Sequence, residues 1–223
     1  MKILVIAPHP DDEVLGCGGA IKKYTKEGNE VFLCIITKGY TPDWTEEFLM
    51  HRKDEVADSA KILGIKQVYF LDFPTVKLDT VPQKDINDAI SKCVEDIRPE
   101  VLYIPHRGDL NKDHKIVFES ALVAARTKPD SSIKKVISYE TLSETEWGNQ
   151  KIEKIEDVFL PNTYVDISET IKDKLKAMEC YGSELQEFPH PRSLRGIEVL
   201  AEKRGMESGF KKAEAFILIK DVG

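Results

Sequence analysis

The sequence predicts an α/β protein with a Rossmann-like, mostly parallel sheet and helices on both faces. Five short apolar runs of strand length alternate with longer segments whose apolar residues recur at helical spacing. Consecutive runs are separated by enough residues for one crossover helix, which is the connection that parallel strands need. The runs are nearly uninterrupted by polar residues, which indicates strands that are buried on both faces.

The first four units are each expected to consist of a strand followed by a helix. Residues 3–7 are the first expected strand and residues 14–24 its helix. Three further units follow, with strands at 30–37, 67–71 and 100–104 and helices at 46–63, 84–97 and 113–126. Gly64 stands directly after the second helix, where glycine is a common stop. A fifth strand is expected at 135–139.

Beyond residue 140 the pattern is looser. Short strands are expected around Phe159 and at 164–167, and Ser168 is expected to cap a helix that runs to about Cys180. A second helix is expected at 194–206 and a last strand at 213–219. We therefore expect one domain over residues 1–223. Residues 1–140 would form its core, and residues 141–223 would form a cap region that packs beside the sheet and closes the active site.

The composition is that of a globular protein without a basic surface. Hydrophobic residues make up 41% and charged residues 32% of the 223 positions, which is enough apolar material for a sizeable core. The formal net charge of −7 argues against a general binder of nucleic acid or anionic membranes. The first apolar run is too short to span a bilayer and lacks the features of a signal peptide. The four cysteines form no CxxC pair, so we expect a reducing, cytoplasmic location.

Residues suited to chemistry gather in three expected loops, at 9–13, 106–114 and 188–193, which hold four of the five histidines. The first two loops follow the first and fourth strands. In a doubly wound sheet these strands flank the point where the strand order reverses, and ligands bind in the crevice at that point. The two loops are therefore expected to face each other across a ligand site.

The residue types in these loops suit a catalytic metal ion. Two imidazoles and one carboxylate form a three-ligand set for a borderline-soft ion such as Zn²⁺ and leave a fourth position for water. Such a water has its pKa lowered to about 7, and a carboxylate outside the ligand set can take its proton. Asp11 and Asp12 fit this division, because neighbouring side chains on a turn point in different directions. Asp113, beside His114, is placed to orient a ligand or a catalytic imidazole.

Plainer interpretations exist for the same residues. Aspartates are favoured at helix starts, so the turn at 9–13 and Asp113 could simply cap helices. The glycines in the segment 16–19 are typical of dinucleotide-binding turns. They do not spell GxGxxG, however, and the acidic turn occupies the place where a pyrophosphate would lie.

The turn His9-Pro-Asp-Asp-Glu13 after a first strand, together with Asp109-Leu-Asn-Lys-Asp-His114 after a later one, resembles the PIG-L/LmbE-like family. Its members are zinc-dependent deacetylases of N-acetylglucosamine-containing substrates. The segments His190-Pro-Arg-Ser193, Arg204-Gly205 and Ala213-Glu-Ala-Phe216 resemble a sugar-deacetylating branch of that family. The paired motifs are specific for the superfamily and much less specific for the substrate.

The resemblance implies a role for each matching residue. His9, Asp12 and His114 become the ligands of Zn²⁺, with Fe²⁺ and Co²⁺ as alternative metals. Asp11 becomes the general base that activates the water. Further substrate contacts are implied or expected at Arg52, Asp72, His106, Asp109, Asn111 and Arg192.

One position departs from the family pattern. Several members carry a histidine three residues before the last ligand, where it stabilises the oxyanion or donates a proton, and here that position is Asn111. We expect the catalytic imidazole to come from His190 instead. His106 is the second choice, because it could serve only to brace its loop.

We therefore expect a metal-dependent amide hydrolase that removes the acetyl group from an N-acetylated amino sugar, whether free, glycosidic or nucleotide-linked. Its partner would be this small molecule and not a nucleic acid, and a homo-oligomer is compatible because related enzymes are often assembled. Two alternatives stay open. A metallophosphoesterase would usually need more carboxylates and a second metal. A non-catalytic metal or sugar-nucleotide binding module is kept open by Asn111.

Overall fold

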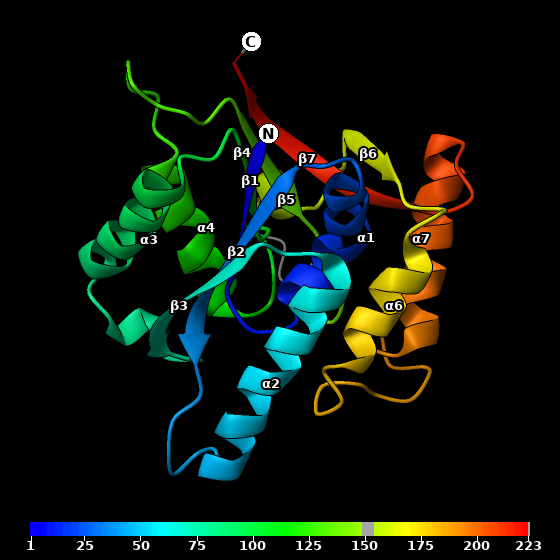
Figure 1. Cartoon of the computed structure of the whole chain (residues 1–223), viewed down its shortest axis with the longest axis horizontal. Helices are drawn as coiled ribbons and strands as arrows, with labels where there is room; N and C mark the ends of the chain where they lie inside the picture. Colours follow the sequence, from blue (N-terminus) through cyan, green and yellow to red (C-terminus); the bar gives the residue numbers. More distant parts are fainter. Residues whose placement is uncertain (149–153, 223) are drawn as a thin grey trace.

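The computed structural model describes residues 1–148 and 154–222, and in this part of the chain seven strands form one sheet (Figure 1). The strand order is β3-β2-β1-β4-β5-β7-β6. Strands β1 to β5 are parallel, whereas β7 pairs antiparallel with β5 and β6 pairs antiparallel with β7. The predicted Rossmann-like, mostly parallel sheet is confirmed.

The strands are β1 (Lys2–Ala7), β2 (Glu30–Lys38), β3 (Gln67–Pro74), β4 (Val101–Ile104), β5 (Lys135–Tyr139), β6 (Thr163–Asp166) and β7 (Ala213–Asp221). The helices are α1 (Asp12–Lys26), α2 (Glu46–Leu63), α3 (Gln83–Ile97), α4 (Lys112–Ala124), α5 (Thr145–Gly148), α6 (Ile171–Glu179) and α7 (Leu194–Ser208), with short 3₁₀ turns η1 (Leu78–Thr80) and η3 (Ile155–Asp157). Among these elements, no helix is both long and apolar enough to cross a membrane.

Strand β1 is the centre of the sheet and separates two apolar cores. Leu4 and Ile6 pack on the face that α3 and α4 cover, whereas Ile3 and Val5 pack on the face of α1, α2 and α6 (Figure 1). This alternation follows from the two-residue period of a strand. Because the neighbours of β1 are β2 and β4, the strand order reverses there, and the loops after β1 and β4 lie at the same edge of the sheet.

The last third of the chain, which we expected to pack beside the sheet, also contributes two strands to it. Its strands β6 and β7 extend the sheet past β5 and so cover the edge that β5 would otherwise expose. Phe159 lies outside any strand. Ser168 does not cap α6, which begins at Ile171, because its hydroxyl donates a hydrogen bond to Asp166 instead.

Helix α1 is interrupted at Cys17, where φ is −145° and ψ is 20°. A buried ion pair between Lys174 and Glu214 bonds the backbone on both sides of this break. The Glu214 carboxylate of β7 accepts hydrogen bonds from the backbone N–H groups of Gly19 and Ala20 at 2.8 and 2.7 Å. Lys174 of α6 donates to Glu214 at 2.6 Å and to the carbonyl oxygen of Leu15 at 2.9 Å. Opposite charges thus satisfy the unpaired N–H and C=O ends of the two helical segments.

The glycines of this break serve close packing. A Cβ atom on Gly16 would lie 2.2 Å from the Tyr139 ring, and one on Gly19 would lie 2.7 Å from Ile167. Only glycine therefore lets α1 approach β5 and the residue that follows β6 so closely. These contacts account for the glycine-rich segment that resembled a dinucleotide-binding turn.

Lys174 and Glu214 should each depend on the other, because a buried charge without its partner is strongly destabilising. We expect Lys174→Met to lower the free energy of unfolding by about 3–5 kcal/mol, because it leaves Glu214 buried without its cation. The matched variant Lys26→Met removes an exposed pair with Asp173 and should cost at most about 1 kcal/mol. Urea unfolding of both variants measures the difference. Equal losses would show that the pair in the break has no special role.

Candidate active site

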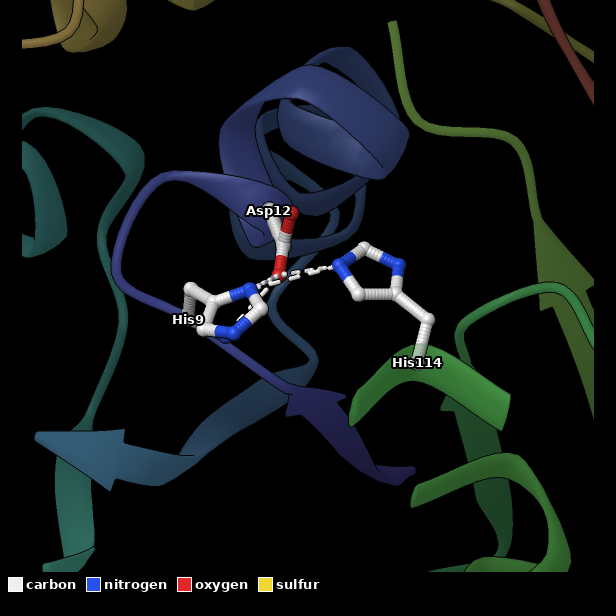
Figure 2. Close-up of side chains that lie close together, drawn as sticks. All are labelled: His9, Asp12 and His114. Atoms are coloured by element: carbon white, nitrogen blue, oxygen red, sulfur yellow. Dashed lines mark hydrogen bonds and ion pairs between the residues drawn. The ribbon is translucent and has the colours of Figure 1, made fainter. Parts of the chain in front are cut away.

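His9, Asp12 and His114 point toward one another at the carboxyl edge of the sheet (Figure 2). His9 lies on the turn after β1, Asp12 is the first residue of α1, and His114 is in the first turn of α4. The Oδ2 atom of Asp12 is 3.4 Å from Nδ1 of His9 and 3.3 Å from Nε2 of His114. The two imidazole nitrogens are themselves 3.3 Å apart. The Asp12 and His114 side chains are fully buried.

A carboxylate behind each imidazole fixes its orientation. Nε2 of His9 donates a hydrogen bond to Asp113 at 3.0 Å, and Nδ1 of His114 donates one to Asp109 at 2.8 Å. In the neutral form of each ring, the other nitrogen then carries a lone pair that faces Asp12. Thr145 holds Asp109 in turn, by donating its hydroxyl hydrogen at 2.6 Å. Such carboxylate–imidazole pairs are typical of the surroundings of protein metal ligands.

This donor set fits a divalent metal ion. A tetrahedral ion with ligand bonds of about 2.0–2.1 Å places neighbouring donors about 3.3 Å apart, which matches the three separations observed. The second carboxylate oxygen of Asp12, Oδ1, is buried and has no hydrogen-bond partner among the described residues. Two imidazoles and a carboxylate are also the ligand types that Zn²⁺ binds.

The pKa values of the three residues show how strongly the cluster attracts positive charge. Burial lowers the pKa of His9, but hydrogen bonds with Asp113 and Asp12 outweigh it and raise the pKa to about 9. Burial likewise lowers the pKa of His114, yet the charge of Asp12 and the bond with Asp109 hold it well above its usual value. Burial raises the pKa of Asp12, but the charges and hydrogen bonds of His114 and His9 together outweigh it and lower the pKa. A metal cation can supply the same positive charge.

Asp11 has an unusual backbone conformation that turns its side chain away from the helix. Its φ of 109° lies in the left-handed region, which costs a non-glycine residue about 1–3 kcal/mol. Its carbonyl accepts hydrogen bonds from Val14 and Leu15, so Asp11 is the N-cap residue of α1, yet its side chain makes no capping bond. Instead Arg192 donates to its Oδ2 at 3.3 Å. The capping interpretation of this carboxylate is therefore wrong.

The electrostatics of Asp11 suit a group that exchanges a proton. Burial raises the pKa of its carboxyl well above the usual range, and the opposing charge of Arg192 reduces this effect. The neighbouring Glu13 is also fully buried, which raises its pKa to about 7. A buried carboxyl group with a raised pKa can both accept and return a proton near neutral pH.

A cavity of about 210 Å³ opens beside these residues. His9, one of the three candidate metal donors, lines it together with Asp11 and Asn111. Its other wall comes from the segment before α2, from α2 and from the end of β3, and its apolar lining includes Trp44, Phe48, Leu49 and Phe70. Gly39 packs against this wall, since a Cβ atom there would lie 2.8 Å from Leu49.

Four of the expected substrate contacts line this cavity. They are Arg52, Asp72, Asn111 and Arg192. Arg52 is held by ion pairs with Glu55 and Glu184, and Asp72 is half exposed at the end of β3, 3.9 Å from Lys38. Asn111 also caps α4 by accepting a hydrogen bond from the Asp113 N–H at 3.0 Å.

Other expected site residues lie outside the cavity. His106 is buried and donates a hydrogen bond to the carbonyl of Asp157, so it braces its loop. Asp109 is buried behind His114, and Asp113 behind His9, where each accepts a hydrogen bond from an imidazole of the candidate metal site. His190 accepts a hydrogen bond from the Arg192 N–H, and its ring contacts Trp147 edge-on at 5.6 Å.

His9 is the one histidine among the described residues that line the cavity. The group that contacts Asp11 is Arg192, two positions after His190. Two further residues, Glu144 and Glu184, were not expected at the site, yet they line the cavity and surround Arg192. No local pattern marks these two glutamates, because they lie outside the motif segments.

Comparison with known proteins places the chain in a family. The family model for PIG-L, described as GlcNAc-PI de-N-acetylase, matches residues 4–125, which is more than half of the chain. The chain belongs to the PIG-L family. This result confirms the predicted family and an enzyme of the deacetylase type. The metal donors and Asp11 lie inside the matched range, whereas Arg192 lies beyond it.

Individual relatives match over nearly the full chain. The diacetylchitobiose deacetylase of Thermococcus kodakarensis is 27% identical over 99% of this chain and 84% of its own. The conserved protein TT1542 from Thermus thermophilus superposes with a TM-score of 0.79 at 25% identity, over 99% of this chain and 96% of that one. The N,N'-diacetylchitobiose deacetylase from Pyrococcus horikoshii, solved with its inhibitor MPG, has a TM-score of 0.78 at 23% identity, over 98% and 84% of the two chains. This last similarity shows the fold alone.

The carboxylates behind the imidazoles should set metal affinity. We expect Asp109→Ala to weaken Zn²⁺ binding by about 10–100-fold, because His114 loses the acceptor that fixes its tautomer. Competition with a chromogenic chelator measures the dissociation constant. The matched control Asp88→Ala, on the exposed surface of α3, should leave it within about twofold. Wild-type affinity in Asp109→Ala would contradict the role assigned to Asp109.

Proposed function

We propose that this protein hydrolyses the acetamide of an N-acetylated amino sugar of the N-acetylglucosamine type and releases acetate and the free amine. The observation that carries the proposal is the Asp11 carboxylate, which lines the cavity beside a convergent set of metal donors. Membership of the PIG-L family and the named activity of the Thermococcus relative support the same reaction class. Zn²⁺ is the metal that we propose, with Fe²⁺ or Co²⁺ as alternatives of similar coordination.

His9, Asp12 and His114 would hold the ion, which would polarise the amide carbonyl and make water nucleophilic. Asp11 takes the proton of the attacking water on its carboxylate. Because burial raises its pKa, Asp11 can hold this proton and return it to the leaving amine. Arg192 keeps the carboxylate oriented and places a positive charge beside the reacting groups.

The rest of the cavity would bind the sugar. Arg52, Asp72 and Asn111 offer polar groups for hydroxyl and carbonyl oxygens. Trp44 and Phe70 offer apolar faces of the kind that pack against sugar rings. Free, glycosidic and nucleotide-linked substrates all share the N-acetylated ring that these groups would contact.

We further propose a single catalytic domain in the cytoplasm. Residues from both parts of the chain, Asp11 and Arg192, meet at the cavity, so neither part would form the site alone. The four cysteines are free thiols, which fits a reducing compartment.

The two alternatives from the sequence have less support. A metallophosphoesterase would commonly use two ions about 4 Å apart, and the described residues contain one group with the geometry of a metal site. A non-catalytic binding module would not need a buried carboxylate held in a strained conformation beside the metal donors.

Acetate release tests the proposed function. Zinc-loaded protein would be incubated with N-acetylglucosamine, N,N'-diacetylchitobiose and a nucleotide-linked N-acetylglucosamine, and acetate and free amine would be quantified. We expect release from at least one of them and a loss of about 10²–10⁴-fold in kcat for Asp11→Asn at unchanged metal content. Asp88→Asn is the matched control. If no substrate yields acetate while zinc is bound stoichiometrically, the deacetylase proposal fails.

The arginine and the histidine of the segment 190–192 are expected to differ in effect. Arg192→Ala should lower kcat by about 10²-fold, because Asp11 loses the cation that orients it. His190→Ala should lower kcat by less than about tenfold, since the imidazole does not line the cavity and, among the described residues, it bonds the Arg192 N–H and packs on Trp147. Steady-state kinetics on the best substrate of the panel separates the two. The reverse order would reinstate His190 as the catalytic imidazole.

A further inference from the structure

Two buried residues outside the metal donor set meet behind Asp11. Glu13, in the first turn of α1, and Tyr181, which follows α6, are both fully buried. The Tyr181 hydroxyl donates a hydrogen bond to Oε1 of Glu13 at 2.6 Å. The backbone N–H of Asp11 donates one to Oε2 of Glu13 at 3.1 Å. One carboxylate therefore connects the C-terminal part of the chain to the peptide of the proposed base.

The backbone of Asp11 requires restraint on both of its sides. A non-glycine residue rarely adopts a φ of 109°, and such a conformation persists only where its surroundings impose it. On the helix side, the carbonyl of Asp11 is held by the N–H groups of Val14 and Leu15, both at 2.9 Å. On the other side, the Asp11 N–H donates a hydrogen bond to Glu13, which is its partner among the described residues. If the peptide before Asp11 rotated, its side chain would no longer face the cavity.

Tyr181 is itself fixed by its surroundings. Its ring belongs to the apolar core on the α1 side of the sheet. The guanidinium of Arg52, a cavity residue, lies over the ring at 5.8 Å from its centroid. The phenol therefore reaches Glu13 from a rigid position and can hold the carboxylate in one rotamer.

We propose that Glu13 and Tyr181 are positioning residues that hold the Asp11 carboxylate in its reactive orientation. The proposal rests on the proposed function, in which Asp11 is the base. Glu13 accepts a hydrogen bond from the Asp11 peptide, and Tyr181 acts through Glu13; neither residue lines the cavity. The negative charge of Glu13 is not required. A glutamine can accept from the Asp11 N–H with its carbonyl oxygen and donate to the Tyr181 oxygen with its amide.

Kinetics of four variants test this chain of contacts. Tyr181→Phe should lower kcat by about tenfold and Glu13→Ala by about a hundredfold, with KM and bound zinc unchanged, because a small misplacement of a catalytic group is costly. Glu13→Gln should stay within about threefold of wild type. The double variant Tyr181→Phe/Glu13→Ala should be no slower than Glu13→Ala alone, since Tyr181 acts through Glu13. Tyr164→Phe, on β6, is the matched control and should change none of these quantities.

Hydrogen exchange of the Asp11 amide supplies a readout that needs no turnover. NMR on the zinc-loaded protein should show this amide protected in wild type and Glu13→Gln, and exchanging faster in Tyr181→Phe and Glu13→Ala. If wild type releases no acetate, the proposed function fails while the exchange rates still test the restraint. If Glu13→Ala does not fold, Tyr181→Phe decides. Unchanged kcat and exchange in Tyr181→Phe, with only a lower melting temperature, would overturn the proposal. A kcat in Glu13→Gln as low as that expected for Glu13→Ala would overturn it as well.

Discussion

Three lone pairs directed at one point form the arrangement on which the rest of this structure depends. Nδ1 of His9, Oδ2 of Asp12 and Nε2 of His114 face each other at tetrahedral spacing, and with both rings neutral these atoms repel one another unless a cation lies between them. Maintaining this arrangement takes rigid supports. The switch point between β1 and β4 brings the two loops together, and the carboxylates behind the rings prevent either imidazole from turning away.

The same fold edge commonly binds phosphate groups, because the start of a helix carries free N–H groups and partial positive charge. Here the chain places its own carboxylates at that position. Asp12 and Glu13 occupy the first turn of α1, and Oδ2 of Asp12 accepts a hydrogen bond from the His9 N–H at 2.8 Å. The protein's own carboxylates thus occupy the place of a bound phosphate. The site is suited to bind a cation, whereas a nucleotide-binding protein of similar fold would bind a phosphate there.

Sequence patterns were sufficient for the parallel part of the sheet and for the meeting of His9, Asp12 and His114, but not for the direction of single side chains. Buried parallel strands appear as apolar runs, and α2 is bounded by the capping Thr45 and by Gly64, so these elements were predictable. Strands β6 and β7 are mixed in polarity, which obscured their place in the sheet. His190 and Arg192 are two residues apart, yet only one contacts Asp11, and spacing alone cannot tell which. The left-handed φ of Asp11 overrode the usual capping preference of aspartate.

The ion pair in the break of α1 has a consequence for how the chain acquires its structure. Glu214 contacts Gly19 and Ala20 across almost the whole length of the sequence, and such contacts form late because a long loop must close first. During synthesis the last metal donor, His114, emerges well before Lys174 and Glu214. All three metal donors are therefore synthesised before the residues that complete α1, the helix that carries Asp12.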